Sequence, residues 1–584
     1  MIEIGVAKVD ITAFEPGLGM MGWGFPENRA TGVAMPLHAR AFVLRDPEQN
    51  RRLALVVADM CFVPQGVRQA VLDALTKWHG HLGLDENTVM LSATHTHSGP
   101  GGTSHHVFYN TNSFGFSRPV FDKIVDGMVE AIVAADAARR PGRVRLSRGE
   151  FPVDQPVAFN RAIRAYNANP EVQPKIPGKR PPEAVDRTMV MLRFDDEQGQ
   201  PIGSVNWFAV HCTSVHRDNT LLHPDNKGLA ADMLETHVRR RQQAADYVAA
   251  FAQGACGDVS PNFRWHQGRG LMVGAVDDDV EAARLNASLQ LDKARELLDG
   301  DKAQELSPNL DGALLHGDFS CMEVEPRFGG GKARHTAPAE IGFRMIIGTD
   351  EGPGLPLRLA PWFEAAARGV GALQRAGDRL NKVLGRGNGG HRQGNKIPFI
   401  TTGKGRGGKL LGTYPLRWPF PLPAGTDPFV AHHKQVGARG GIGDLPWTPQ
   451  VLPAQILIIG ELALAAVPSE FTTVSGHRLR QSLLERLRER GVRDVVIAGY
   501  SNSYAGYVTT PEEYALQGYE ASSTHFGPWT LGAHQTLFDR VARRLLVDPE
   551  LRPQDLGAVT PRFDDDELSR RAYSLDTAPP MARS

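Results

Sequence analysis

Residues 88–102 read TVMLSATHTHSGPGG and join an apolar strand to a polar turn. Side chains two positions apart on a strand point to the same face, so we expect His95 and His97 to project together. Two imidazoles at a strand end suit a zinc site, or one metal ligand beside one acid–base group. Two hydrogen-bonded histidines with a purely structural role are the alternative. The Gly-Pro-Gly-Gly run at 99–102 opens the backbone to a ligand and favours a functional site.

The pattern of an apolar strand followed by polar residues recurs along the chain. It predicts buried strands at residues 52–59, 88–93, 203–210, 247–252, 455–467 and 494–498, and helices at residues 121–138, 229–245, 276–298 and 474–490. This alternation predicts a mixed α/β fold, with one large domain whose central β-sheets are flanked by helices. Ligand sites in such folds lie just beyond strand ends, which is where the candidate residues of this chain occur.

Two further strand ends carry candidate residues. His211, in WFAVHCTS, follows the strand at 203–210 and would supply a third imidazole, although a capped strand-end histidine is the alternative. Its neighbour Cys212 would face the opposite side and is assigned to the core. Ser260, in GDVSPN, lies in a turn and is followed by proline, so it is not the nucleophile elbow of an α/β-hydrolase. A lone serine in a turn is more typical of a structural role.

A third pair of segments adds a carboxylate and three phenols. Glu470, in PSEFTT, lies where a predicted strand ends and a predicted helix begins, and is a candidate site carboxylate. The alternative is that its negative charge only stabilises the N-terminus of that helix. Residues 499–507, GYSNSYAGY, carry three tyrosines directly after a predicted strand. A packed aromatic turn is the alternative for this loop.

Composition and charge narrow the class of protein. Lys plus Arg and Asp plus Glu number 65 each among 584 residues, so no basic excess indicates a nucleic-acid partner. No apolar run reaches the roughly 18 residues of a membrane-spanning helix, and the start MIEIGVAKVDIT lacks the order of a signal peptide. We expect a cytoplasmic protein, or a secreted or periplasmic one if a leader has been removed. The four cysteines have no metal-binding spacing and are expected to be buried free thiols.

Taken together, these segments resemble the neutral (neutral/alkaline, non-lysosomal) ceramidase family. The matching blocks are THTHSGPGG, NRA at 160–162, WFAVHCTS with DNKG, GDVSPN, PSEFTT, AGY and YEASSTHFGPWT, in family order over residues 3–540. Family members commonly carry a C-terminal β-sandwich, for which residues 531–584 are too few. We therefore expect a hydrolase domain at 1–547 and a polar, weakly structured C-terminal extension at 548–584.

The resemblance implies a single Zn²⁺ held by His95, His211, Glu470 and Tyr507. It places His97, Arg161 and Tyr519 around the scissile amide, makes Ser260 a serine needed for activity, and leaves Asp258 as a partner of these groups. The role of Ser260 stays open: it could attack the amide, or it could position water and substrate. Zinc-bound water is the favoured nucleophile, because a zinc ion already supplies a nucleophilic water.

The implied activity is zinc-dependent hydrolysis of the N-acyl amide of ceramide or a ceramide-like lipid, to a fatty acid and a sphingoid-type amine. A zinc amidase acting on another N-acyl lipid or a smaller amide is the first alternative, and a non-catalytic lipid-binding protein is the second. The helical pattern at 360–384 and the basic, Gly-rich loop at 385–408 would provide peripheral membrane contact or a lid; an ordinary packed helix and a solvated loop are the alternative.

Overall fold

The computed structural model describes residues 1–242, 244–354, 393–403, 435–441 and 445–573, with isolated positions between 364 and 432. The predicted helix at 360–384 therefore lies almost entirely outside the described residues. None of the helices within this described part is long and apolar enough to cross a bilayer.

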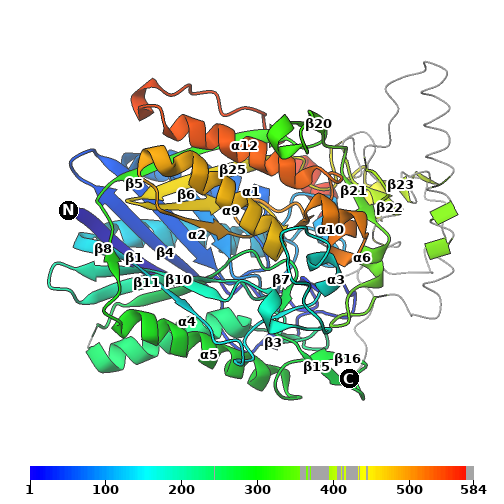
Figure 1. Ribbon diagram of the computed structural model, residues 1–584, viewed down its shortest axis with the longest axis horizontal. Coiled ribbons are helices and arrows are strands. Elements are labelled where there is room, and N and C mark those ends of the chain that lie inside the picture. Colours follow the sequence, from blue (N-terminus) through cyan, green and yellow to red (C-terminus); the bar gives the residue numbers. More distant parts are fainter. Residues whose placement is uncertain are drawn as a thin grey trace.

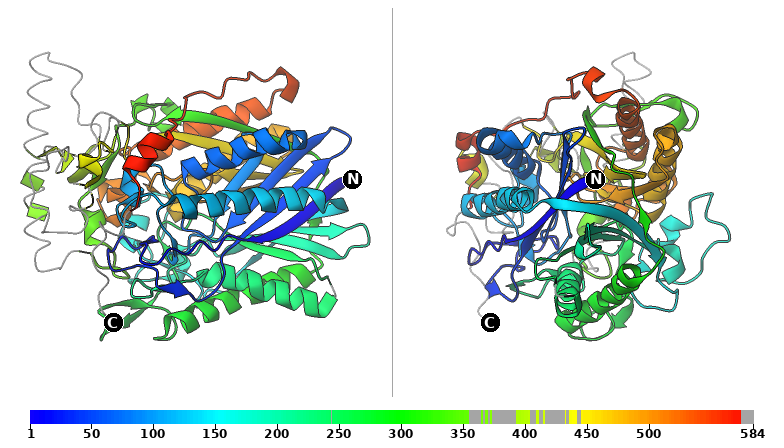
Figure 2. Two further views of the ribbon diagram at one scale, coloured as in Figure 1. Left: turned by 180° about the vertical axis from the view of Figure 1, so that it is seen from behind. Right: turned by 90° about the vertical axis from the view of Figure 1, so that its left-hand side faces the viewer.

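Two β-sheets stacked face to face form the centre of the molecule, with helices on both outer sides (Figure 1, Figure 2). The larger sheet has the order β13-β11-β10-β8-β1-β4-β5-β6, with β17 paired to β8, and the smaller sheet has the order β18-β25-β26-β28. The expected mixed α/β fold with central sheets flanked by helices is confirmed.

The strand bounds of the larger sheet are Ile2–Asp10 (β1), His38–Asp46 (β4), Arg51–Ala58 (β5), Val89–Ala93 (β6), Arg140–Glu150 (β8), Thr188–Asp196 (β10), Pro201–Phe208 (β11), Val248–Gln253 (β13) and Gln304–Glu305 (β17). Those of the smaller sheet are Leu310–Asp318 (β18), Val451–Ile459 (β25), Leu462–Ala466 (β26) and Asp494–Ala498 (β28). The pairs β5–β6, β11–β13 and β26–β28 are parallel, which brings their carboxyl ends to one edge of the stacked sheets.

Alternation along the strands gives each sheet two apolar faces. In β5, Leu53, Leu55 and Val57 enter the core between the two sheets, whereas the intervening Ala54, Val56 and Ala58 pack under helices. Those helices are α1 (Gln65–His79), α2 (Arg118–Ala137), α4 (Asp225–Gln242) and α5 (Asp279–Asp299). The outer face of the smaller sheet is covered by α9 (Thr473–Leu487) and α12 (Thr530–Leu545). The result is a helix–sheet–sheet–helix sandwich.

The predicted helices match α2, α4, α5 and α9 to within a few residues at each end. The earlier start of α2 has a local cause, because the Ser117 side chain accepts a hydrogen bond from the Val120 amide and proline occupies the first turn. The single strand predicted at 455–467 is wrong: the chain turns at Gly460 and Glu461 to form the hairpin of β25 and β26. Gly460 has a φ of 58°, a left-handed conformation that glycine adopts without strain.

Two further expectations need correction. Of the loop predicted at 385–408, residues 393–403 are described; they include strand β22 (Pro398–Thr401), with Gln393 and Lys396 buried. The apolar run IPFIT at 397–401 supplies the strand-forming side chains. Cys61, Cys212 and Cys256 are buried free thiols as expected, but Cys321 is exposed.

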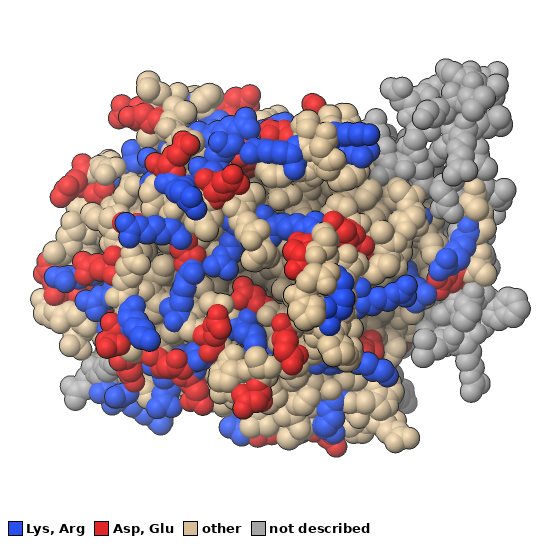
Figure 3. Space-filling view, viewed as in Figure 1, with Lys and Arg blue, Asp and Glu red and all other residues tan. Residues whose placement is uncertain are grey.

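The C-terminal segment packs against the body instead of being weakly structured over its described residues, 548–573. Arg552 forms two hydrogen bonds with the Asp311 carboxylate, at 2.9 and 2.6 Å. Leu568, on α13 (Asp565–Arg570), is buried, and the Tyr573 amide donates to the Phe116 carbonyl at 2.8 Å. On the face shown in Figure 3, basic and acidic side chains are interspersed instead of gathered by sign.

Candidate metal centre and active site

The carboxyl ends of five strands converge on one buried cluster. His95 and His97 follow β6, His211 follows β11, Ser260 lies beyond β13, Glu470 follows β26, and Tyr507 follows β28. Direct contacts join the two sheets here: the Leu91 amide donates to Asn502 Oδ1 at 3.1 Å, and the Gly257 amide donates to the Phe471 carbonyl at 2.8 Å. The structure therefore brings these candidate residues together at the strand ends.

His95, His211 and Glu470 form a group that could hold a metal ion, because their ligand atoms all lie within 4.8 Å of one another. His211 Nε2 lies 3.2 Å from Glu470 Oε2, and His95 Nε2 lies 3.7 Å from the same oxygen. All three side chains are buried. Two imidazole nitrogens and a carboxylate suit zinc in catalytic sites.

Backbone carbonyls fix which nitrogen each histidine offers. His95 Nδ1 donates to the Cys61 carbonyl at 2.7 Å, and His211 Nδ1 donates to the Val259 carbonyl at 2.9 Å. Each ring therefore turns its Nε2 towards Glu470, the orientation that metal-binding histidines adopt. His211 Nε2 is buried and makes no hydrogen bond within the described residues, so the site leaves a ligand atom for a cation.

The backbone at His95 is strained, in a conformation that presents the ring to this cluster. Its φ is 71°, in the left-handed region that costs a non-glycine residue free energy. The His95 amide donates to the Met60 carbonyl at 2.9 Å, which helps to hold the conformation. Such strain is concentrated at functional sites.

The charge balance of the cluster also calls for a cation. Although burial opposes ionisation, neighbouring His95 and His211 hold the pKa of Glu470 far below its usual range. Burial and Arg161 lower the pKa of His211, but Cys256 and Glu470 outweigh them and raise it to about 10. Burial lowers the pKa of His95 to about 3, so this imidazole is neutral and able to coordinate. A divalent ion would replace the proton on His211.

Two tyrosines that were not singled out as site residues hold the Glu470 carboxylate. The Tyr500 hydroxyl donates to Glu470 Oε2 at 3.1 Å, and the Tyr504 hydroxyl donates to Oε1. The Tyr500 ring also stacks on His95, with 3.9 Å between ring centroids. The tyrosine-rich motif was a signal for this role, but its spacing could not distinguish the tyrosine that would bind metal from those that orient its ligand.

Tyr507 lies beside Glu470 because strands β27 (Glu470–Phe471) and β29 (Tyr507–Val508) pair in parallel, with these two residues in register. Arg161 Nη2 donates to the Tyr507 hydroxyl at 3.0 Å. Burial and Glu470 raise the pKa of Tyr507 well above its usual value, while Arg161 opposes that rise. A cationic partner of this kind favours the phenolate that a metal would bind.

The other candidates line the same centre. His97 Nε2 lies 3.1 Å from His95 Nε2, and burial lowers the pKa of His97, so this ring is neutral. The Tyr519 ring lies edge-on to that of Tyr507, with 5.5 Å between centroids, and burial raises the Tyr519 pKa to about 12. Its hydroxyl therefore stays protonated and can donate. Arg161 is fixed by Glu520, with Nε 3.1 Å from Oε1.

Asp258 and Ser260 occupy the loop behind the cluster. Asp258 Oδ1 accepts from the backbone and hydroxyl of Thr473, the first residue of α9, and its Oδ2 accepts from Asn160. This carboxylate thus ties the residue before Arg161 to the helix that follows Glu470. Ser260 is fully buried, and its Oγ accepts from the Asn262 amide at 2.9 Å.

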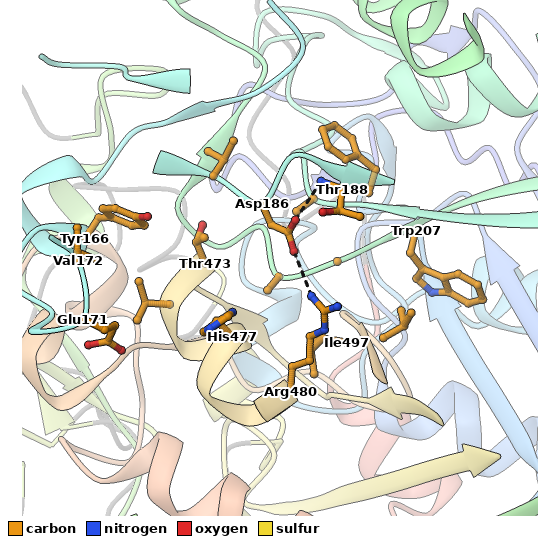
Figure 4. A pocket seen from close by; sticks show the side chains of 18 of the residues that line it. Tyr166, Glu171, Val172, Asp186, Thr188, Trp207, Thr473, His477, Arg480 and Ile497 are labelled. Atoms are coloured by element: carbon orange, nitrogen blue, oxygen red, sulfur yellow. Dashed lines mark hydrogen bonds and ion pairs between the residues drawn. The ribbon is translucent and has the colours of Figure 1, made fainter. Parts of the chain in front are cut away.

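A cavity of about 650 Å³ lies apart from this cluster, and none of the nine predicted site residues lines it (Figure 4). Its apolar floor includes Trp207 and Ile497, and Arg480 faces Asp186 across it at 3.9 Å. Thr473 lines the cavity and also binds Asp258.

The fold gathers the strand-end residues into a buried cluster that could hold a metal ion, and comparison with known proteins identifies the family. The family described as neutral/alkaline non-lysosomal ceramidase, N-terminal, matches residues 2–360 and 431–536. The chain belongs to this family.

Curated relatives and solved structures agree. The chain is 36% identical to the neutral ceramidase of Pseudomonas aeruginosa, over 96% of this chain and 74% of that protein. It is 32% identical to the neutral ceramidase of Mycobacterium tuberculosis, over 95% of this chain and 78% of that protein. A solved structure described as "Ceramidase complexed with C2" matches 96% of this chain and 77% of its own, with a TM-score of 0.77 and 33% identity.

Proposed function

We propose that this chain is a zinc-dependent amidohydrolase that cleaves the N-acyl amide bond of ceramide, releasing a fatty acid and a sphingoid amine. The observation that carries the proposal is the buried group of His95, His211 and Glu470 in a chain of the ceramidase family. Relatives that match nearly the whole chain are named neutral ceramidases.

The proposed metal ligands are His95, His211, Glu470 and Tyr507. The orphaned His211 Nε2, the fixed Nδ1 atoms and the ionised Glu470 fit a zinc ion. When bound, zinc supplies Lewis acidity and makes water nucleophilic near neutral pH. Tyr500 and Tyr504 hold Glu470 in place, which keeps the donor set preorganised.

The remaining residues are assigned to proton transfer and charge stabilisation. His97 is neutral and lies against His95, so it can accept a proton and return it to the leaving amine. Tyr519 keeps its proton and can donate to the amide oxygen as negative charge develops there, a type of contact worth about 3 kcal/mol. Arg161 is bound to Glu520 and Tyr507, so we assign its effect to the Tyr507 phenol.

Ser260 and Asp258 are assigned to positioning. Ser260 is fully buried and hydrogen-bonded to its own turn, which supports orienting water and substrate over direct attack. Asp258 connects Asn160, next to Arg161, with Thr473, next to the Glu470 segment.

Since the proposed substrate is a membrane lipid, we also propose peripheral contact with a lipid surface. Co-sedimentation of the protein with neutral lipid vesicles tests this contact.

A substrate panel tests the activity. Fatty-acid release is measured from N-acyl sphingosines of short and long acyl chain, from an N-acylethanolamine and from an N-acyl amino acid, with a chelator-treated sample beside each. We expect metal-dependent release that is greatest from the N-acyl sphingosines. Greater release from another amide would move the assignment to that substrate, and no metal-dependent cleavage of any amide would refute a hydrolase.

A further inference from the structure

Glu351 is a buried carboxylate at the edge of the active site that was not singled out from the sequence. It follows the short helix α6 (Arg344–Ile347) and is 1% exposed. Its Oε1 accepts from Arg180 Nη1 at 3.0 Å. Its Oε2 accepts from Asn262 Nδ2 at 3.2 Å and from Thr213 Oγ1 at 3.3 Å. A carboxylate buried this completely needs such partners to remain charged.

Two of the partners of Glu351, Thr213 and Asn262, lie in loops that carry predicted site residues. Thr213 lies two positions after His211, and Asn262 lies two positions after Ser260. Asn262 Nδ2 also donates to the Thr213 carbonyl at 2.8 Å, and its backbone amide donates to Ser260 Oγ at 2.9 Å. The carboxylate therefore sits where the chain after β11 meets the turn that holds Ser260.

The surrounding charge keeps Glu351 ionised. Burial opposes this, but the positive charges of Arg180, Arg161 and His211 lower its pKa to about 2. Because an ionised carboxylate only accepts hydrogen bonds, Glu351 can hold Asn262 Nδ2 and Thr213 Oγ1 together on its Oε2. The Asn262 backbone in turn holds Ser260, whose Oγ accepts from the Asn262 amide at 2.9 Å and donates to the Asn262 carbonyl at 3.4 Å. Glu351 therefore acts on Ser260 through Asn262.

We propose that Glu351 is a positioning residue for this active site, which holds the turn of Ser260 and Asn262 against the His211 segment. The inference rests on the proposed hydrolase function and adds a residue to it. Glu351 acts through Ser260 and Asn262 and is not assigned to the metal or to the substrate.

The isosteric change Glu351→Gln separates charge from shape. A carboxamide has one accepting oxygen and one donating NH₂ group, whereas the site presents donors to both oxygens of Glu351. Whichever way the amide is turned, its NH₂ group then faces a donor, either Arg180 or the pair Asn262 and Thr213, and the contact that holds the Ser260 turn is weakened. Glu351→Asp keeps the charge and should restore part of the activity.

Asp350 provides a matched control on the same loop. Its carboxylate also pairs with Arg180, but its side chain is 51% exposed and sits outside the Ser260 turn. Asp350→Asn removes a neighbouring charge from the same arginine without touching Asn262 or Thr213.

The test compares kcat, KM and bound zinc for wild type, Glu351→Gln, Glu351→Asp and Asp350→Asn on a short-chain N-acyl sphingosine. We expect Glu351→Gln to lower kcat by at least about tenfold, with KM within about twofold and zinc content unchanged, because orientation is lost and binding is kept. Glu351→Asp should recover part of kcat, and Asp350→Asn should match wild type.

Two results would overturn the inference. One is a Glu351→Gln variant with wild-type kcat. The other is a kcat that falls only in step with zinc content or with the folded fraction measured by circular dichroism, and is not recovered by Glu351→Asp. An inactive wild-type protein carrying zinc would instead refute the proposed function.

Discussion

At the residue scale, the orientation of one carboxylate decides whether the cluster can hold a metal. Glu470 is buried between His95 and His211, and both of its oxygens accept a tyrosine hydroxyl. These phenols stabilise the charged carboxylate and limit its rotation. They belong to the loop after β28, so this loop contributes more than the single ligand expected from it.

Removing one of these hydroxyls should weaken the metal site without emptying it. We expect Tyr504→Phe to reduce zinc affinity about 10- to 100-fold, as is typical when the partner of a metal ligand is lost. Competition with a fluorescent zinc chelator measures the change.

Tyr109→Phe is the matched control. The Tyr109 hydroxyl is buried and has no hydrogen-bond partner within the described residues, and its ring lies 5.2 Å from that of Tyr504. An equal loss of zinc affinity in both variants would mean that packing, and not the hydrogen bond to Glu470, supports the site.

At the element scale, the short helix α13 anchors the C-terminal segment that we propose as an extension of the hydrolase domain, beginning at residue 548. Leu568 on this helix is 3% exposed, whereas Leu551 on the same segment is 77% exposed. We expect Leu568→Ala to lower the free energy of unfolding by about 2–4 kcal/mol, and Leu551→Ala to change it by less than about 0.5 kcal/mol.

Thermal unfolding of the two variants in parallel measures the difference. If both unfold like the wild type, the segment contributes nothing to stability and the original expectation of a weakly structured tail is the better description.

The elements also show what local sequence can predict. Strong apolar runs and helical periodicity located β5, β6, β11, β13 and β28 and the helices α2, α4, α5 and α9 to within a few residues. The hairpin at Gly460 was missed because an apolar run does not reveal a turn when a single glycine and one glutamate make it. The strand ends predicted the location of the candidate site, because parallel strands align their carboxyl ends. Contacts between residues far apart in the sequence could not be predicted in this way. Glu351 is such a case, because its partners lie 89 to 171 positions away.

At the scale of the whole molecule, buried neutral histidines make stability depend on pH. Burial lowers the pKa of His534 to about 3, and burial with Lys396 does the same for His525. Burial and nearby arginines lower the pKa of His105 to about 4. In the unfolded chain a histidine titrates near pH 6.5. Below that pH the unfolded state binds protons that the folded state does not, so stability is lost as pH falls towards 4.

We expect the melting temperature of the metal-free protein to fall by about 5 °C or more between pH 7 and pH 4.5. Using metal-free protein separates this effect from the release of bound metal at low pH. A melting temperature that stays constant over this range would show that these histidines do not oppose protonation in the folded state.

The sandwich as a whole brings side chains from five strand ends into one buried centre. The outermost of them in the sequence, His95 and Tyr507, are 412 positions apart. The most direct test is to titrate metal-free protein with zinc while following fatty-acid release from a short-chain N-acyl sphingosine. We predict that activity rises linearly and stops rising at one zinc per chain, and that His95→Ala shows neither binding nor release. Full hydrolysis before any zinc is added, or one bound zinc without amide cleavage, would contradict the account.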